Sequence, residues 1–219
     1  MFNFRLYLLL ARLRSKSSMK MGHPGTIMRI AFVIYDGMTM LDFVGVFDAV
    51  TRLKTMGFIE DLAWDICALT PEVTGTAGLV IKANKIGEPL SGYEVIVVPG
   101  GHGYDRLLNH ENFLDWLRTG NEARWMTSVC TGSLLLGAAG LLRNKTATTH
   151  PTAMEQLKPY CAVVSNARIV DDRTVITARG VTASIDLGLY LCGKLAGPEV
   201  KEKIRKQMDY SMPGASPVG

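Results

Sequence analysis

A cysteine at position 130 stands where a buried strand is expected to turn directly into a helix. The apolar run 125–129 precedes it, and an alanine- and leucine-rich helix that starts at Thr131 follows it. Such a turn projects a nucleophile clear of the sheet, and Gly132 permits close packing of strand and helix. The positive end of the helix dipole should lower the pKa of the Cys130 thiol and populate the thiolate. We therefore predict that Cys130 is a catalytic nucleophile and not merely a small buried residue.

Residues suited to binding or acid–base chemistry follow two other expected strands. Gly100 and Gly101 come after the apolar run 94–98, where backbone amides can turn toward a ligand as an oxyanion hole, although such glycines often only permit a turn. Asp42 stands at the start of a predicted helix, where it can stabilise the helix dipole or act as acid or base toward Cys130. The glycines have neither the GxGxxG spacing of a dinucleotide site nor the lysine of a P-loop.

The cysteines argue against a metal or disulfide framework. Four of them are scattered along the 219 residues, with no CxxC pair and no histidine cluster. We therefore expect no metal site, and a reducing, cytoplasmic location. The four are Cys67, Cys130, Cys161 and Cys192.

The net charge of +4 comes from the N-terminal segment. Residues 1–27 hold five Lys and Arg and no Asp or Glu, which leaves the rest of the chain near −1. The folded part is therefore not expected to bind nucleic acid, and no apolar run reaches the roughly 18 residues of a membrane span. We interpret residues 1–27 as an extension outside the fold: either a transit-like or membrane-surface peptide, or sequence upstream of a true start such as Met28.

From residue 28 to about 210, predicted strands and helices alternate. This alternation, with continuous apolar runs in the strands, predicts one domain with a doubly wound, mostly parallel sheet and helices on both faces. Residues 211–219 form a Pro/Gly/Ser-rich tail that should fray. The predicted strands are 29–35, 63–69, 94–98, 125–129, 145–148, 162–170 and 175–178, with a hairpin or edge segment over 74–85, and the predicted helices are 41–56, 112–123, 131–142, one starting at 152, 182–195 and 199–208.

The segments RIAFVIYDG, LDFVGVFDAV, VIVVPGGHG, SVCTGSLLLGAAGLL, ATTH and VITARGVTASIDLGLYL, in this order, resemble the ThiJ/PfpI superfamily. The resemblance covers about residues 28–210 and implies a flavodoxin-like, class I glutamine amidotransferase-like fold. It is greatest to the isonitrile hydratase branch. That branch implies a homodimer without cofactor that adds water to an isonitrile and gives an N-substituted formamide. It assigns the nucleophile to Cys130, a neighbouring hydroxyl to Thr131 and the essential acid to Asp42.

Two positions depart from that branch, and one histidine is ambiguous. Val46 stands where the branch usually has proline, which removes no chemical group. Pro151 stands where the branch usually has tryptophan, a position that can shape the pocket. His150 lacks the glutamate two residues later that amidotransferases need. We expect it to bind or pack near the pocket, with a role as catalytic base as the alternative.

Other functions use the same cysteine. A glyoxalase- or deglycase-type enzyme would act on small α-oxoaldehydes, although a longer glutamate suits its carbon base better than Asp42. A non-enzymatic sensor would instead bind a ligand, or would respond to oxidants through oxidation of Cys130 to a sulfinate. Relatives fused to an AraC-type DNA-binding region form a third class, but no helix-turn-helix pattern follows Tyr210 here. No sequence feature supports a structural or chaperone role.

The hydration reaction has two possible routes. Cys130 can attack the isonitrile covalently, or Asp42 can activate water directly.

Overall fold

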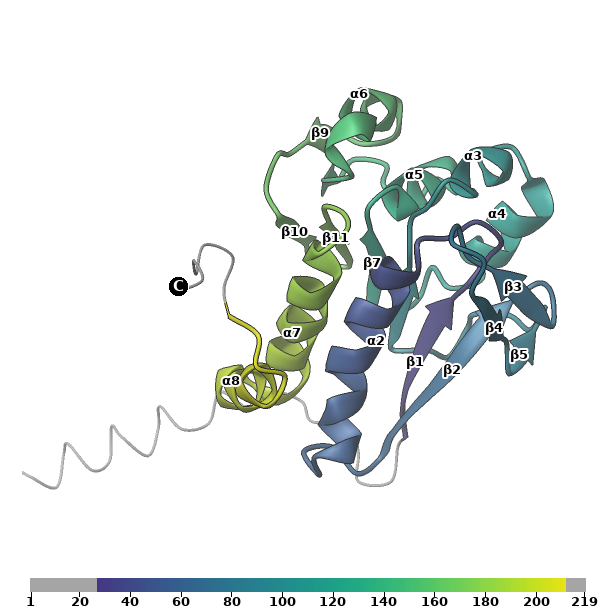
Figure 1. Cartoon of the computed structure of the whole chain (residues 1–219). Helices are drawn as coiled ribbons and strands as arrows, with labels where there is room; N and C mark the ends of the chain where they lie inside the picture. The colour runs from purple at the N-terminus through teal and green to yellow at the C-terminus, as the bar shows by residue number, and fades with distance from the viewer. Residues whose placement is uncertain (1–26, 212–219) are drawn as a thin grey trace, which may run out of the picture.

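The computed structural model describes residues 27–211, and at its centre lies a seven-stranded sheet (Figure 1). Its strand order is β10-β11-β7-β6-β1-β2-β5, and every neighbouring pair is parallel except β10–β11. The predicted fold class is therefore confirmed. The strands of this sheet are β1 (Met28–Val33), β2 (Leu62–Ala68), β5 (Lys85–Ile86), β6 (Val95–Val98), β7 (Trp125–Val129), β10 (Ile169–Asp172) and β11 (Val175–Ala178).

Helices cover both faces of the sheet (Figure 1). The first face is covered by α2, α7 and α8, which pack on one another, and the second by α3, α4 and α5. The helices are α2 (Met40–Thr55), α3 (Tyr104–Leu107), α4 (Glu111–Arg118), α5 (Gly132–Ala138), α6 (Met154–Leu157), α7 (Ala183–Ala196) and α8 (Pro198–Gln207).

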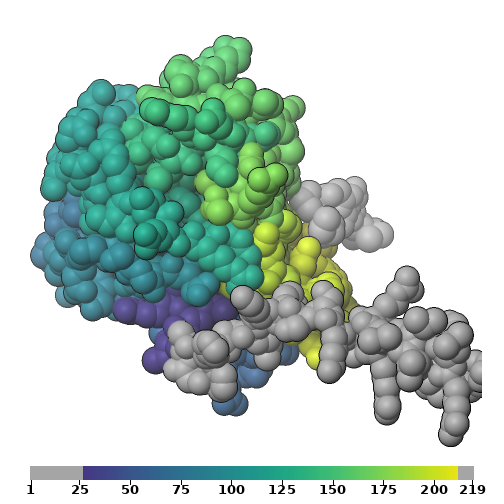
Figure 2. All heavy atoms as spheres, turned by 180° about the vertical axis from the view of Figure 1, so that it is seen from behind, coloured from purple at the N-terminus to yellow at the C-terminus, as the bar shows by residue number. Residues whose placement is uncertain are grey.

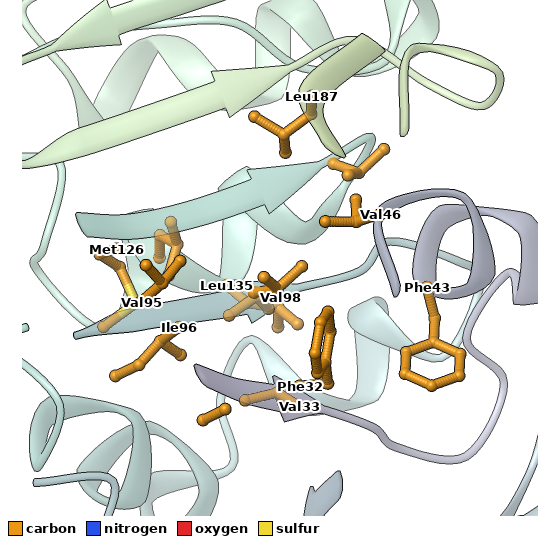
Figure 3. Close-up of a cluster of buried hydrophobic side chains, with 14 of the residues drawn as sticks. Phe32, Val33, Phe43, Val46, Val95, Ile96, Val98, Met126, Leu135 and Leu187 are labelled. Carbon is orange, nitrogen blue, oxygen red and sulfur yellow. The ribbon is translucent and has the colours of Figure 1, made fainter. Parts of the chain in front are cut away.

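The core follows from strands that are apolar on both sides. All residues of β6 and β7 are buried, as continuous apolar runs in a parallel sheet should be. Figure 3 shows Val46 of α2 near Leu187 of α7, and Leu135 of α5 belongs to the same buried cluster as Val98 of β6. Both helical layers thus pack on the strands whose carboxyl ends hold the predicted site.

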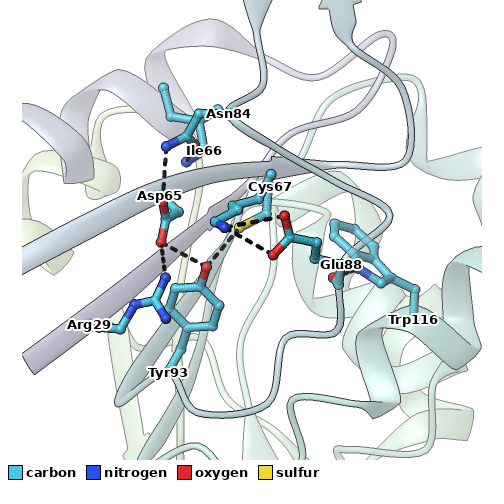
Figure 4. A network of polar contacts seen from close by, with 9 residues as sticks. Arg29, Asp65, Ile66, Cys67, Asn84, Glu88, Tyr93 and Trp116 are labelled. Atoms are coloured by element: carbon cyan, nitrogen blue, oxygen red, sulfur yellow. Dashed lines mark hydrogen bonds and ion pairs between the residues drawn. The ribbon is translucent and has the colours of Figure 1, made fainter.

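A polar network ties the strand β2 to its neighbours away from that edge (Figure 4). Asp65 accepts hydrogen bonds from Arg29 of β1 at 2.7 Å, from Tyr93 at 2.8 Å and from Asn84 at 2.9 Å. These partners hold the pKa of Asp65 below its usual value although burial acts against them. A nearly buried carboxylate with three donors is a structural feature that orders β1, β2 and the start of β6.

Two small sheets lie outside the main one. The hairpin or edge segment predicted over 74–85 is present as a hairpin that begins two residues earlier, with β3 (Glu72–Thr74) antiparallel to β4 (Val80–Lys82). A second pair, β8 (Thr146–Ala147) with β9 (Val163–Val164), is parallel. The chain between β8 and β9 projects at the top of the molecule in Figures 1 and 2. The predicted strand 145–148 therefore does not join the central sheet.

Three predicted helices are shorter than expected. The helix predicted over 112–123 is α4, which ends at Arg118. The helix predicted over 131–142 is α5, which ends at Ala138 because Gly140 takes a left-handed backbone with φ of 80°. The helix predicted from 152 is divided into a 3₁₀ turn η1 (Pro151–Ala153), α6 and a second 3₁₀ turn η2 (Lys158–Tyr160). Pro159 favours this break, since proline cannot donate a backbone hydrogen bond within a helix.

The boundaries expected for the domain fall close to the limits of the described residues. The predicted extension, residues 1–27, lies outside them apart from Ile27, and the predicted tail lies outside them apart from Ser211. Among residues 27–211, no helix has both the length and the apolar character required to cross a membrane.

Candidate active site

Cys130 occupies the turn between β7 and α5 at the carboxyl edge of the sheet. Its φ of 56° is a left-handed conformation, which is uncommon for residues with a side chain. A Cβ at Gly132 would meet the Val98 carbonyl oxygen at 2.4 Å, so the helix can start this close to the sheet only because Gly132 has none. The sharp strand-to-helix turn expected at this cysteine is therefore present.

Three hydrogen bonds hold the backbone of Cys130 in this conformation. Its amide donates to the Ala178 carbonyl at 3.0 Å. Its carbonyl accepts from the hydroxyl of Thr149 at 3.0 Å and from that of Ser133 at 3.2 Å. Strained residues of this kind cost roughly 1–3 kcal/mol and persist where the surroundings over-determine them. The bonds from β11, α5 and the segment after β8 thus fix the direction of the thiol.

Asp42 is fully buried in the first turn of α2. Its Oδ2 accepts a hydrogen bond from the Gly100 amide at 3.1 Å, whereas Oδ1 has no partner within the part of the chain that the structure describes. Burial raises the pKa of the carboxyl to about 7, although the Gly100 amide and the Cys130 thiol act in the opposite direction. Asp42 therefore exchanges a proton near neutral pH, which is the property of an acid–base catalyst.

The thiol of Cys130 is held in its protonated form. Burial raises its pKa to about 12, and the nearby Asp42 carboxylate adds to this, while the amide and hydroxyl of Thr131 act against it. The expectation that the helix dipole lowers this pKa and populates the thiolate was therefore wrong. Cys130 is only 6% exposed, so its thiolate loses most of its hydration. This loss destabilises the thiolate more than the dipole of the seven-residue helix α5 stabilises it.

Asp42 and Cys130 form a coupled acid–base pair, since each affects the pKa of the other. Above neutral pH the proton resides on sulfur and the negative charge on the carboxylate. A substrate carbon that bonds to sulfur would release that proton, and Asp42 is the adjacent group able to accept it. The arrangement can therefore deliver a nucleophile and a proton to one small region of the pocket.

The amides of Gly100 and Gly101 hold side chains of the site. The Gly100 amide donates to Asp42, and the Gly101 amide donates to the Thr131 hydroxyl at 3.0 Å. The oxyanion-hole role expected for these two amides therefore does not match their partners in this structure. A Cβ at Gly101 would meet the Thr39 nitrogen at 2.3 Å, so a glycine is required for this close approach.

A pocket of about 320 Å³ opens above Cys130, and His150 lines it together with Thr131. The Nδ1 atom of His150 accepts from the Thr152 amide at 3.3 Å, so in the neutral ring the proton is on Nε2. The structure thus places His150 at the pocket, and its role in binding or as a base stays a prediction. The remaining lining residues are Thr39, Gly101, His102, Tyr104, Thr152, Ala153, Gln156 and Val181.

No group of three or more His, Cys, Asp and Glu side chains within residues 27–211 is arranged to hold a metal ion. The cysteines of the same range are unpaired, and Cys67 and Cys192 are buried away from the pocket. Thiol chemistry in this pocket therefore falls to Cys130.

The model of the DJ-1/PfpI family matches residues 28–193, more than half of the chain. The chain belongs to the DJ-1/PfpI family. The isonitrile hydratase of Pseudomonas putida is 37% identical to it over 185 residues, which cover 84% of this chain and 79% of the relative. This identity supports an enzyme of the family.

Members with other functions are also similar. The HTH-type transcriptional regulator GbdR of Pseudomonas aeruginosa is 25% identical over 185 residues, which cover 83% of this chain but 50% of that regulator. The crystal structure of a THiJ/PfpI family protein from Pseudomonas syringae superposes with a TM-score of 0.76 at 30% identity, and the match covers 91% of this chain and 85% of that chain. The family thus includes both enzymes and regulators.

Two residues of this DJ-1/PfpI site were not assigned a role from the sequence. The hydroxyl of Tyr35 donates to the Pro99 carbonyl at 2.9 Å, next to the Gly100 amide that binds Asp42. Burial, and then the charges of Asp42 and Cys130, raise the pKa of Tyr35, which marks it as a neighbour of the pair. The sequence indicates this role only weakly, because Tyr35 is a single polar residue at the end of an apolar strand.

Gly180 is a second residue that sequence did not reveal. A Cβ there would lie 2.6 Å from Cys130 Sγ and 2.9 Å from His150 Cδ2. Gly180→Ala should therefore displace or cover the thiol and slow its alkylation by iodoacetamide at least about tenfold, because interiors have no room for an added methyl group. Mass spectrometry of the Cys130 peptide measures this rate.

Gly193→Ala is the matched control, because its Cβ would first meet the flexible Lys201 Cδ at 3.3 Å. It should alkylate like the unmodified protein. Equal rates in both variants, with unchanged thermal unfolding, would contradict the close approach of Gly180 to the thiol.

Proposed function

We propose that the protein hydrates isonitriles to N-substituted formamides without a cofactor, with Cys130 as nucleophile and Asp42 as acid and base. The observation that carries this proposal is the buried pair itself, in which a protonated thiol lies beside a carboxyl whose pKa is about 7. The 37% identity to an isonitrile hydratase supports the same reaction.

The chemistry of an isonitrile suits a pair of this kind. Its terminal carbon has to receive both the nucleophile and a proton, since the product carries oxygen and hydrogen on that one atom. A thiol whose proton passes to an adjacent carboxylate can supply both to the same carbon. Groups on opposite sides of a pocket would suit a carbonyl substrate better, because nucleophile and proton then act on different atoms.

In the first step, Cys130 sulfur bonds to the isonitrile carbon while its proton passes to the Asp42 carboxylate. The electron pair that stays on the carbon then takes this proton from Asp42. The product is a neutral thioimidate, in which one carbon is bound to sulfur, to hydrogen and doubly to nitrogen. Asp42 is again a carboxylate, so the charge of the buried site is the same before and after the step.

In the second step, Asp42 accepts a proton from water as the water oxygen bonds to the same carbon. The electron pair of the C=N bond moves to nitrogen, which takes up the proton. The C–S bond then breaks as the C=O bond forms, and the hydroxyl proton is passed back to sulfur. The balance is one isonitrile and one water consumed for one formamide released, with Thr131 positioned to bind the polar groups of the intermediate.

The other route, in which Asp42 activates water directly and Cys130 acts as acid, gives the same product. A redox sensor is less well supported, because a thiol with a pKa of about 12 supplies little of the thiolate that peroxides oxidise. A glyoxalase-type enzyme uses the same cysteine, and the assay below separates it from a hydratase.

The purified protein should convert cyclohexyl isocyanide to N-cyclohexylformamide, measured by chromatography, and leave methylglyoxal unchanged in a parallel assay. Lactate from methylglyoxal without any formamide would instead support the glyoxalase-type function. Inactivity toward both substrates, in protein that unfolds cooperatively, would contradict the hydratase proposal and favour a sensor.

We also propose that one domain, residues 28–210, works in the cytoplasm as a homodimer. Free cysteines at all four described positions support a reducing location. Exposed apolar side chains support self-association: Leu41 and Val44 on α2, and Leu79 and Val80 at the β3–β4 hairpin. Sedimentation equilibrium would measure a single-chain mass if the dimer proposal is wrong.

A further inference from the structure

The outer rim of the Cys130 pocket is closed by a contact between two distant segments. Tyr104 begins α3, directly after the Gly100–Gly103 turn, and Gln156 lies in α6. The Tyr104 hydroxyl donates to Gln156 Oε1 at 2.8 Å, and both residues line the pocket that contains Cys130. The bond therefore joins two segments of the pocket lining in its exposed part.

The wall that carries Gln156 stands apart from the main sheet. The segment between β8 and β9 comprises η1, α6 and η2, and Figure 1 shows α6 and β9 beyond the end of the central strands. This segment packs on α5, where Tyr160 contacts Gly137, and α3 packs on α5 as well. The two walls thus share one support, and the Tyr104–Gln156 bond joins them across the pocket.

This bond is suited to opening. Gln156 is exposed and Tyr104 is half-buried, so water can replace either partner at small net cost. The groups deeper in the site are different, because Asp42 and Thr131 are buried and hydrogen-bonded to the Gly100–Gly101 turn. The rim can therefore change without moving the reacting pair.

The pocket beneath the rim is small. Its volume of about 320 Å³ is at the lower end of the range for ligand pockets. An isonitrile is linear from its carbon through nitrogen to the first atom of its substituent. With its carbon at Cys130 Sγ, the substituent is carried straight away from the sulfur, and its bulk meets the surrounding walls.

We propose that the Tyr104–Gln156 pair is a size-selective gate that determines how large a substituent reaches Cys130. The assignment to isonitriles rests on the proposed function, whereas the gate itself rests on the contact and the pocket. Pro151 supports this assignment of the segment, because it starts η1, whose Thr152 and Ala153 line the same pocket. The turn that starts at Pro151 thus holds two residues of the pocket lining.

The first test compares kcat/KM for 2-naphthyl isocyanide and methyl isocyanide. Gln156→Ala shortens the rim and Tyr104→Phe removes only the hydrogen bond, so both should raise the ratio of the bulky to the small substrate, the former about tenfold. Gln156→Glu keeps an acceptor for Tyr104 and should retain the original ratio. A ratio that stays within twofold in Gln156→Ala, or an equal fall for both substrates, would overturn the gate.

The second test does not depend on hydration. Cys130 is alkylated with iodoacetamide or with N-(1-pyrenyl)maleimide, and the rate of each is followed by mass spectrometry of the Cys130 peptide. Gln156→Ala should speed the bulky reagent relative to the small one. Tyr190→Phe, which removes the hydroxyl that binds Asp171 outside the pocket, should leave this ratio unchanged.

The two tests separate the two proposals. A protein without formamide production that still shows the alkylation effect would retain the gate and lose the hydratase function. Formamide production with no change in either ratio would retain the hydratase and exclude the gate.

Discussion

Cys130→Ala should lower formamide production by at least about a thousandfold, because the thiol is the nucleophile of the covalent route and the acid of the other route, and Cys130 is the cysteine that lines the pocket. Cys130→Ser keeps a hydroxyl of similar size but a poorer nucleophile, and it should also be nearly inactive. Formamide release from cyclohexyl isocyanide measures both variants, and thermal unfolding confirms that they fold.

Cys161→Ser is the matched control for this prediction. Among the described cysteines, Cys161 is the one that is partly exposed, and it does not line the pocket. Cys161→Ser should turn over substrate like the unmodified protein.

Mass spectrometry of unmodified protein quenched during turnover should find a Cys130 adduct with the mass of the whole isonitrile. Unchanged turnover in Cys130→Ala would contradict both hydration routes, and full turnover in Cys130→Ser without an adduct would favour direct attack by water.

Asp42→Asn should lower kcat/KM by at least about a hundredfold, since the variant cannot accept the thiol proton or return it to carbon. In the unmodified protein kcat/KM should rise with pH through an apparent pKa near 7. The sign follows from the mechanism: the carboxylate is the reactive form, and it replaces the protonated carboxyl as pH passes the pKa of about 7. The pH profile of formamide release measures this limb.

Asp42→Asn should lower activity but raise the free energy of unfolding at neutral pH. The pKa of Asp42 is about 7 in the folded protein against 3.8 for an unperturbed aspartate, so unfolding releases a proton at pH values between these two. The free energy of unfolding therefore falls as pH rises from about 4 to about 7, by up to about 4 kcal/mol at 1.36 kcal/mol per unit. Asp42→Asn should not show this fall. Its free energy of unfolding should therefore increase relative to that of the unmodified protein as pH rises.

Denaturant unfolding at pH 4.5 and pH 8 measures that difference, and the comparison between variants removes the contributions of Asp65 and Asp171. Those two carboxyls have lowered pKa values and stabilise the fold with the opposite pH dependence. Asp48→Asn is the matched control, because Asp48 lies on the same helix but is exposed and paired with Arg52. A parallel pH dependence in Asp42→Asn and the unmodified protein would contradict the raised pKa.

Chemistry within a few consecutive residues could be predicted from sequence. The turn at Cys130 depends on an apolar strand, a cysteine and Gly132 in direct succession, and the structure has that turn. The order of strands and helices was predictable for the same reason, because each apolar period is local. The position of Asp42 beside Cys130 was different: the two residues are 88 positions apart, so its place at a helix start left a capping role open, and the resemblance to a family favoured the pairing.

The protonation of the pair was predicted wrongly because burial is a tertiary property. The helix dipole at Cys130 is visible in the sequence, whereas the loss of water around the thiol depends on every element packed above it. The same holds for Gly100 and Gly101. Their amides point to Asp42 and Thr131 because α2 and the Cys130 turn converge on them, and no spacing within the chain encodes that approach.

The sequence by itself determined a doubly wound sheet with a cysteine at a strand-to-helix turn, because apolar periodicity and glycine spacing are local properties of the chain. The tertiary structure decided where the proton of the site resides, and it brought Tyr104 to Gln156 and Gly180 to the thiol. The physical reason is that desolvation and close approach depend on how segments far apart in the chain pack together.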